Sequence, residues 1–157
     1  MSSAEFDLEP PIHLHTCRVL YGDTDAAGVV YYANYLRFCE AGRSEYMRDL
    51  VRHSYRRLEE MGLILPVVDC RVRYKASARY DDLLSVETSL VAIRPVSCRF
   101  NYRISSQEGR LLALAYTVHA VVNPQGKLAR FPAEILSLLD QAAGNIRTRR
   151  FLKSDGP

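Results

Sequence analysis

The sequence of 157 residues lacks the features that mark membrane or secreted proteins. No apolar run approaches the roughly 18 residues of a membrane-spanning helix. The first fifteen residues have neither a basic start nor an apolar stretch, so we expect no signal peptide. Hydrophobic residues make up 48% of the chain and charged residues 25%. These proportions are typical of a globular protein, and the length predicts a single domain.

The cysteines are too scattered to form a metal site or a disulfide framework. The four cysteines stand far apart, with no C-x-x-C pair and no clustered histidines; they are Cys17, Cys39, Cys70 and Cys98. Such spacing predicts free thiols and no metal. Free thiols in a chain without a targeting segment favour a cytoplasmic location.

Lysine is scarce, and the net charge of +3 is too small to predict nucleic-acid binding. Lysine supplies three of the 21 basic residues and arginine supplies the others. The planar guanidinium group suits phosphate and carboxylate recognition, although a bias in composition would also explain the excess. We interpret residues 143–157 as a basic, solvated tail.

The pattern of the chain predicts one long helix between strand-like segments. Residues 1–11 lack periodicity and contain Pro10-Pro11, so we predict a disordered lead-in before a domain over residues 12–142. Residues 12–21 are rich in strand formers. Residues 32–53 have helical spacing. The apolar face of this helix comprises Tyr35, Phe38, Cys39, Gly42, Tyr46 and Leu50. Gly42 on this face favours a close approach to the packing partner.

Four more strand-like segments follow, at residues 63–77, 81–93, 96–109 and 110–126, and residues 132–140 predict a short helix. The order is strand, long helix, four strands in a meander and short helix. Because the sheet is the only large partner for the helix, this order predicts an α+β fold with an antiparallel sheet wrapped around a central helix. Open edges of such a sheet invite pairing between subunits.

Two carboxylates precede the long helix, in the segment "YGDTDAAGVVYY". Asp23 and Asp25 are two residues apart, so their side chains diverge and a two-carboxylate dyad is not expected. Each can cap a turn, which is the favoured role of Asp23. Nonpolar residues follow Asp25, which predicts a partly desolvated but ionised carboxylate, suited to a nucleophile or a base.

The start of the helix supplies a second chemical group. The first peptide N–H groups of a helix have no intrahelical acceptor, so those near Val30, Tyr31 and Tyr32 are suited to hold a developing oxyanion. Gly28 has no side chain to block approach. A carboxylate beside such donors favours acyl transfer.

The segment "DTDAAGVVYYANYLRFCEAGRSEYM", residues 23–47, resembles the signature of the hotdog-fold thioesterases of the 4-hydroxybenzoyl-CoA thioesterase family. The family pattern is D-x-D-x-x-G, two apolar residues, an aromatic residue and a tyrosine four positions on. The matching positions are Asp23, Asp25, Gly28, Val29, Val30, Tyr31 and Tyr35. The later segment "ARYDDLLSVET" is also similar to the family. The similarity extends over about residues 13–139, and the chain also looks close to the Tol-Pal-associated acyl-CoA thioesterases.

This resemblance implies a hotdog fold, in which an antiparallel sheet wraps around a long central helix. It also implies dimers joined through sheet edges, often paired into tetramers, with active sites at the dimer interface. The implied activity is hydrolysis of an acyl- or aryl-CoA to the free acid and coenzyme A, without a cofactor. The resemblance assigns the catalytic carboxylate to Asp25, the oxyanion donor to the backbone N–H of Tyr32, and the turn to Gly28.

The chain departs from the Tol-Pal-associated enzymes at Tyr32, where they commonly have histidine. A backbone role does not depend on the side chain, so it carries over. The 4-hydroxybenzoyl-CoA enzymes have an aromatic residue there, which favours an aromatic or nonpolar acyl pocket. Glu40 is an alternative catalytic group, because one branch of these enzymes uses a helical glutamate, but a surface ion pair with Arg37 or Arg43 is the simpler expectation.

Coenzyme A carries phosphate groups, for which basic residues near strand ends are candidates. These candidates are Arg94, Lys127 and Arg130, although solvated surface residues would look the same. Two other functions stay open: a hotdog hydratase or dehydratase, and a non-catalytic acyl-CoA-binding protein. The sequence does not identify the acyl group, nor whether Asp25 attacks the carbonyl itself or activates water.

Overall fold

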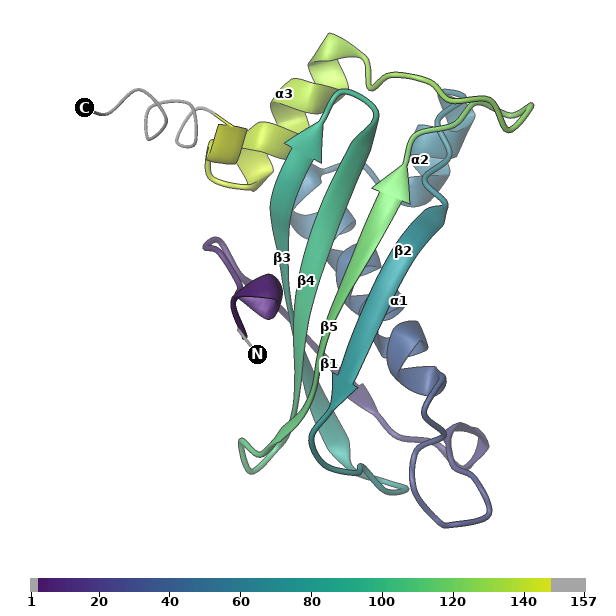
Figure 1. The fold of residues 1–157 in the computed structure, drawn as a ribbon, viewed down its shortest axis with the longest axis vertical. Helices are drawn as coiled ribbons and strands as arrows, with labels where there is room; N and C mark the ends of the chain where they lie inside the picture. The colour runs from purple at the N-terminus through teal and green to yellow at the C-terminus, as the bar shows by residue number, and fades with distance from the viewer. Residues whose placement is uncertain (1–2, 148–157) are drawn as a thin grey trace.

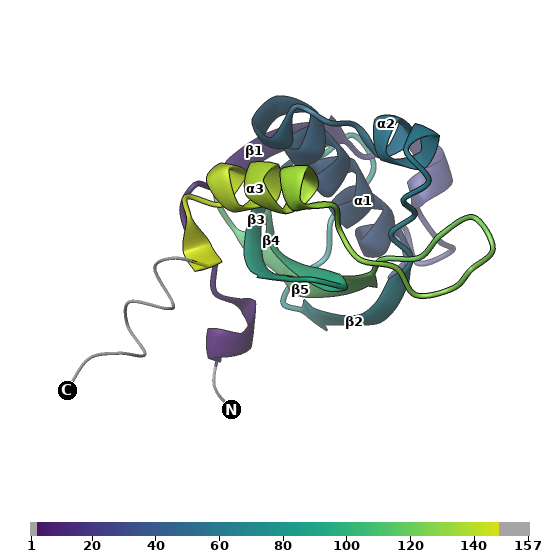
Figure 2. The ribbon, with the colours of Figure 1, turned by 90° about the horizontal axis from the view of Figure 1, so that it is seen from above.

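One antiparallel sheet curves around one long helix, as Figures 1 and 2 show. This computed structural model describes residues 3–147. The strands are β1 (His13–Arg18), β2 (Val67–Tyr74), β3 (Leu83–Arg94), β4 (Ser97–Ser106) and β5 (Leu111–Ala120). The helices are α1 (Asn34–Tyr46), α2 (Tyr55–Glu60) and α3 (Ala133–Ala142). The predicted α+β hotdog fold is thus confirmed.

Helix α1 packs its apolar stripe on the sheet, as the spacing predicted. Its buried residues are Tyr35, Phe38, Cys39, Gly42 and Tyr46. A Cβ atom at Gly42 would lie 2.6 Å from Oγ1 of Thr88 and 2.7 Å from Cγ1 of Val86, both on β3. Such distances are shorter than van der Waals contact, and overpacking of this kind is destabilising. Glycine therefore allows α1 to lie directly on β3.

The long helix ends earlier than predicted. Helix α1 gives way after Tyr46 to a π-helical turn at Met47–Val51, and Arg52 then adopts a φ of 64°. Met47 and Val51 remain buried through this turn, so the apolar pattern continues past the α-helical segment. Ser54 caps the start of α2, since its Oγ accepts a hydrogen bond from the Arg57 N–H at 3.2 Å.

The strand order is β1-β3-β4-β5-β2, and all neighbours are antiparallel. Only β3, β4 and β5 form a meander, so the prediction of a four-stranded meander is wrong for β2. Strand β1 occupies the outer side of β3, and β2 therefore pairs with the free side of β5. The other side of β2 is an edge of the sheet, with Val67, Val68 and Tyr74 exposed along it.

The N-terminal segment packs on the outer face of the sheet. Residues Ser3–Phe6 form a 3-10 helical turn, and Phe6, 2% exposed, contacts Tyr116. Nδ2 of Asn101 donates to the carbonyls of Glu5 and Asp7, at 3.1 and 2.7 Å. Residues 3–7 thus pack on the sheet, where the sequence predicted a disordered lead-in over residues 1–11. The contacts use main-chain carbonyls and one aromatic ring, which leave no periodic pattern in the sequence.

Most of the predicted C-terminal tail, residues 148–157, lies outside the described residues. Within residues 3–147, no helix is both long and apolar enough to span a bilayer. All four cysteines are free thiols, as predicted.

Candidate functional site

The loop between β1 and α1 is closed by its own main chain. The Asp25 N–H donates to the Val29 carbonyl and the Gly28 N–H donates to the Asp25 carbonyl, both at 2.9 Å. Gly28 has a φ of 76°, in the left-handed region that favours glycine. A Cβ atom at Gly28 would meet no atom closer than Nη1 of Arg79, at 3.8 Å. Backbone conformation, and not lack of space, therefore requires glycine at this position.

The carboxylate of Asp25 is exposed and has bonding capacity left. Its Oδ1 accepts a hydrogen bond from the Ala27 N–H at 2.9 Å, which orients the side chain. Within residues 3–147 it forms no ion pair, and Oδ2 accepts no hydrogen bond. The predicted partial desolvation is thus absent from the single chain, because Ala26 and Ala27 beside it are exposed as well.

Asp23 lies in a different environment and has a structural role. It is 4% exposed, and it forms an ion pair with Arg37 of α1. Its Oδ2 accepts a hydrogen bond from the Leu20 N–H at 2.8 Å. Its carbonyl accepts from the Tyr31 N–H at 2.8 Å and from Nδ2 of Asn34 at 2.9 Å. Asp23 therefore joins the end of β1, the loop and the start of α1.

Of the three peptide N–H groups proposed as donors, two are already bonded. The Val30 N–H donates to the Ala78 carbonyl and the Tyr31 N–H to the Asp23 carbonyl, each at 2.8 Å. The Tyr32 N–H forms no hydrogen bond with any atom of residues 3–147. A tight turn starts at this point, since the Asn34 N–H donates to the Tyr31 carbonyl at 2.9 Å. Tyr32 therefore presents the free donor at the start of the helix.

Asp25 and Tyr32 line one cleft, of about 370 Å³. The cleft is formed by Asp25, Val29, Val30, Tyr32, Tyr35, Tyr74, Lys75, Ala76 and Ser77. Its volume is within the range of small-molecule sites. The sequence did not single out the residues from Tyr74 to Ser77, because their place beside Asp25 depends on the pairing of β2 with β5.

Tyr74 connects this strand end to the start of the helix. Its hydroxyl donates to the Tyr32 carbonyl at 2.8 Å, and its ring packs edge-on against Tyr35, with centroids 5.3 Å apart. The Tyr35 hydroxyl accepts a hydrogen bond from the Ala78 N–H at 3.2 Å. Burial raises the pKa of Tyr35. Partial burial at the strand end also raises the pKa of Tyr74. Both phenols therefore keep their protons at neutral pH.

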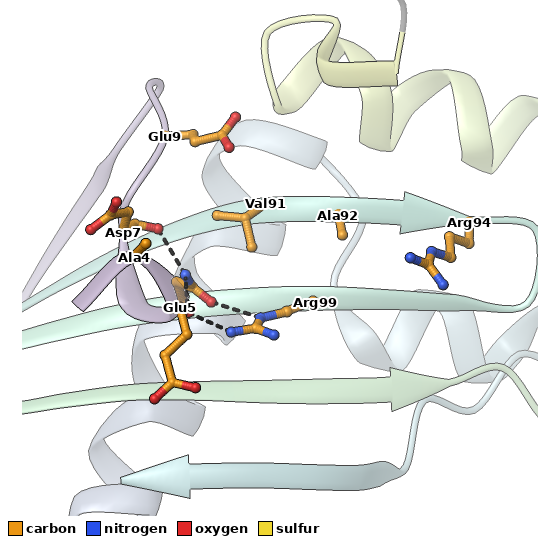
Figure 3. A pocket seen from close by; sticks show the side chains of 9 residues that line it. Ala4, Glu5, Asp7, Glu9, Val91, Ala92, Arg94 and Arg99 are labelled. Atoms are coloured by element: carbon orange, nitrogen blue, oxygen red, sulfur yellow. Dashed lines mark hydrogen bonds between the residues drawn. The ribbon is translucent and has the colours of Figure 1, made fainter. Parts of the chain in front are cut away.

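The basic residues proposed from the sequence lie elsewhere. Arg94 ends β3, whereas the Asp25 loop adjoins the start of β3, roughly 35 Å away along the strand. Figure 3 shows Arg94 lining a separate hollow of about 380 Å³ on the outer face, with Glu5 and Arg99. Lys127 and Arg130 lie in the segment after β5. None of the three proposed residues lines the Asp25 cleft.

Glu40 is exposed on α1 and does not line the cleft. The expected ion pair between Glu40 and Arg37 is absent, because Arg37 pairs with Asp23. Glu40 forms no ion pair with Arg43 within residues 3–147 either. In the same part of the chain, no three metal-ligating side chains come together.

Known proteins resemble the chain in both sequence and structure. A family model described as the thioesterase-like superfamily matches residues 19–139. The chain is 37% identical over 118 residues to the acyl-CoA thioesterase YbgC of Haemophilus influenzae, which covers 75% of this chain and 87% of that protein. Among solved structures, the hypothetical protein TT1821 from Thermus thermophilus superposes with a TM-score of 0.78 and 30% identity, over 83% of this chain and 98% of that one.

A further solved structure is that of a mutant 4-hydroxybenzoyl-CoA thioesterase in complex with 4-hydroxybenzoyl-CoA. It superposes with a TM-score of 0.73 and 26% identity, over 82% of this chain and 98% of that one.

Proposed function

Given that the chain belongs to the thioesterase-like superfamily and is a thioester hydrolase of the hotdog fold, we propose that it hydrolyses an acyl- or aryl-CoA to the free acid and coenzyme A. Relatives named as acyl-CoA thioesterases support this substrate class. The observation that carries the proposal is the shared cleft, in which an exposed carboxylate and an unbonded helix-start N–H lie together.

In the proposed mechanism the thioester carbonyl lies between Asp25 and Tyr32. Addition to the carbonyl carbon moves negative charge onto its oxygen, and the Tyr32 N–H donates a hydrogen bond to that oxyanion. Coenzyme A then leaves as a thiolate. Because thiols have a pKa near 8.5, this departure needs little help from a general acid.

Asp25 has two possible parts in the addition step. Its free Oδ2 can attack the carbonyl carbon, which gives a mixed anhydride that water then cleaves. It can instead take a proton from an attacking water molecule. Both routes need an accessible carboxylate with an unoccupied oxygen, and Asp25 has both properties.

The cleft also bears on the acyl group. Two exposed tyrosines line it, Tyr32 and Tyr74, and their rings offer flat contact surfaces to an aryl or other nonpolar group. This supports the preference for an aromatic or nonpolar acyl chain.

We further propose a dimer formed through β2, with pairs of dimers forming a tetramer. The exposed edge of β2 has main-chain groups free for pairing. A two-fold axis through this edge pairs the strands antiparallel, which places the start of one β2 beside the end of the other. Ile64, just before β2, bridges to Val122 and through it to Leu128. This arrangement would bring the partner subunit's Lys127 and Arg130 toward Asp25 and cover its exposed carboxylate.

The test is release of free thiol from a panel of aryl-CoA and short- to medium-chain acyl-CoA thioesters, followed with a thiol reagent. We expect turnover of at least one class and loss of that turnover in the Asp25→Asn variant. Absence of thiol release from every thioester, with tight acyl-CoA binding, would instead indicate a non-catalytic binding protein. Hydration of an enoyl-CoA without thiol release would indicate a hydratase.

A further inference from the structure

A second hollow, of about 410 Å³, adjoins the Asp25 cleft. Ser77 lines both the cleft and this hollow, so the two are neighbours. The hollow lies between the start of β3 and the turn that joins β4 to β5. Figure 1 shows this turn at the same end of the sheet as the loop that carries Asp25. Arg79 and Arg110 supply its positive charge.

The guanidinium of Arg79 lies beside the catalytic loop. Its Nη1 is 3.8 Å from the position that a Cβ atom would take at Gly28, and Gly28 is bonded to the main chain of Asp25. Within residues 3–147, the Arg79 side chain pairs with no carboxylate. Its charge and its donors are therefore available to a ligand that extends from the cleft.

Arg110 lies on the other side of Ser77. Its Nη2 donates to the Ser77 carbonyl at 3.0 Å, and it also forms no ion pair within the described chain. Its positive charge acts on the phenol of Tyr35 in the cleft, where it partly offsets the rise in the pKa of Tyr35 that burial causes. Arg110 therefore lines the hollow and contacts Ser77, the residue that the two cavities share.

Two carboxylates also line this hollow, but within residues 3–147 neither forms an ion pair with its arginines. Oδ2 of Asp82 accepts a hydrogen bond from the main-chain N–H of Arg79 at 2.8 Å, so it caps a turn. Glu108 is exposed in the turn between β4 and β5. Within residues 3–147 the Arg79 guanidinium keeps its donors, and that of Arg110 uses one for the Ser77 carbonyl. Arg37, Arg48 and Arg71 instead use theirs in ion pairs.

We propose that Arg79 and Arg110 bind the phosphate groups of the coenzyme A part of the substrate, an assignment that rests on the proposed acyl-CoA thioesterase function. Guanidinium groups bind phosphate oxygens through paired, charge-assisted hydrogen bonds. The β4–β5 turn lies one to two strand spacings from the end of β2, or about 5 to 10 Å. The long, flexible pantetheine arm crosses this distance, with the thioester beside Asp25 and the phosphates at the arginines.

The experiment compares two thioesters of the same acyl group, one of coenzyme A and one of N-acetylcysteamine, which has no phosphate. The variants are Arg79→Gln, Arg110→Gln and the double variant. Arg103→Gln is the matched control, because Arg103 is an exposed arginine on β4 outside both cavities and without an ion pair in residues 3–147.

We expect each single variant to raise KM for the acyl-CoA roughly tenfold, as the loss of one charge-assisted contact predicts. The value of kcat, and KM for the N-acetylcysteamine thioester, should change less than about twofold. The nucleotide fragment 3′,5′-ADP should inhibit the wild-type enzyme competitively and the double variant about 100-fold more weakly, if the two contacts add.

Equal changes in KM for both thioesters would overturn the assignment. A rise in KM for the acyl-CoA alone in Arg94→Gln, Lys127→Gln or Arg130→Gln, with no change in the Arg79 and Arg110 variants, would overturn it as well. Arg110→Lys keeps the positive charge and so separates its effect from loss of the Ser77 contact. This variant should recover part of the acyl-CoA affinity that Arg110→Gln loses. No recovery in a variant with a normal melting temperature would contradict a role for the charge. A wild-type protein that binds 3′,5′-ADP through these arginines but releases no thiol would leave this site standing while the proposed function fails.

Discussion

Asp23 and Asp25 are two residues apart in the sequence but belong to two different regions of the molecule. Asp23 is on the sealed side beneath α1, where its charge is paired with Arg37 and its oxygens are bonded. Asp25 is on the open side at the start of α1, with one carboxylate oxygen free beside a free N–H. The difference shows that unused bonding capacity, and not residue type or spacing, distinguishes the carboxylate that we propose to be catalytic from the structural one.

The largest expected effect is on the open side. Asp25→Asn keeps an acceptor for the Ala27 N–H but removes the nucleophile or base, so kcat should fall about 10³-fold. Thiol release from the best acyl-CoA measures this. The melting temperature should stay within a degree or two of wild type. Near-normal turnover would remove Asp25 from the mechanism and erase the contrast between the two carboxylates.

On the sealed side, Asp23→Asn should reduce stability by about 2 kcal/mol. The substitution leaves the Arg37 guanidinium beside a neutral amide and weakens the bond from the Leu20 N–H. Urea unfolding measures the change in the free energy of unfolding. Activity per folded molecule should fall less than in Asp25→Asn. A variant as stable as wild type but as inactive as Asp25→Asn would show that Asp23 acts in the chemistry.

The buried interior at the far end of β5 should be sensitive to acid through His119. Its Nδ1 bonds to the Leu65 carbonyl at 3.0 Å and its Nε2 to Oγ1 of Thr117 at 2.8 Å. Burial lowers the pKa of His119 from 6.5 to about 4. The unfolded chain therefore binds a proton more readily than the folded one between these values, and acid favours unfolding. From pH 7 to pH 5 the loss should be about 2 kcal/mol.

Urea unfolding at pH 7 and pH 5 tests this, with His119→Gln compared with wild type. Carboxylates also contribute to the acid sensitivity, so the informative quantity is the difference between the two proteins. An unchanged pH dependence in His119→Gln would show that this imidazole is not the group that resists protonation.

The smallest expected effect tests how the open side is held in place. Tyr74→Phe removes the hydroxyl that bonds to the Tyr32 carbonyl, and the main-chain bond left on that carbonyl, from the Tyr35 N–H, is long at 3.4 Å. We expect kcat to fall about fivefold, near 1 kcal/mol, with KM nearly unchanged. Tyr116→Phe is the control, since its hydroxyl bonds to Asp69 at 3.3 Å, away from the cleft. Equal losses of kcat in both variants would point to a general structural effect.

The sequence predicted the parts of the molecule that depend on local pattern. The apolar stripe of α1 and the α+β fold class follow from periodicity, and Asp23 and Gly28 take the turn positions that their chemistry favours. The partner of β2 was not predictable, because a strand pattern does not say which edge is free. For the same reason Tyr74, Lys75 and Ser77 entered the site only with the structure.

Local pattern also could not tell the helix-start amides apart. The N–H groups of Val30 and Tyr31 are already bonded to the carbonyls of Ala78 and Asp23, so they cannot bind a ligand. Ala78 is 48 positions from Val30 in the chain, beyond the reach of a local pattern. Similarly, the docking of residues 3–11 depends on Asn101, on a distant strand.

The contrast between three consecutive amides has a spectroscopic consequence. The Val30 and Tyr31 protons are held by carbonyl acceptors, so their exchange with deuterium should be slow, whereas the Tyr32 proton should exchange freely. A bound oxyanion mimic would slow exchange at Tyr32 and leave its two neighbours as they were. Under the proposed mechanism, the Tyr32 amide would therefore report on site occupancy by NMR, and the amides of Val30 and Tyr31 would serve as the internal reference.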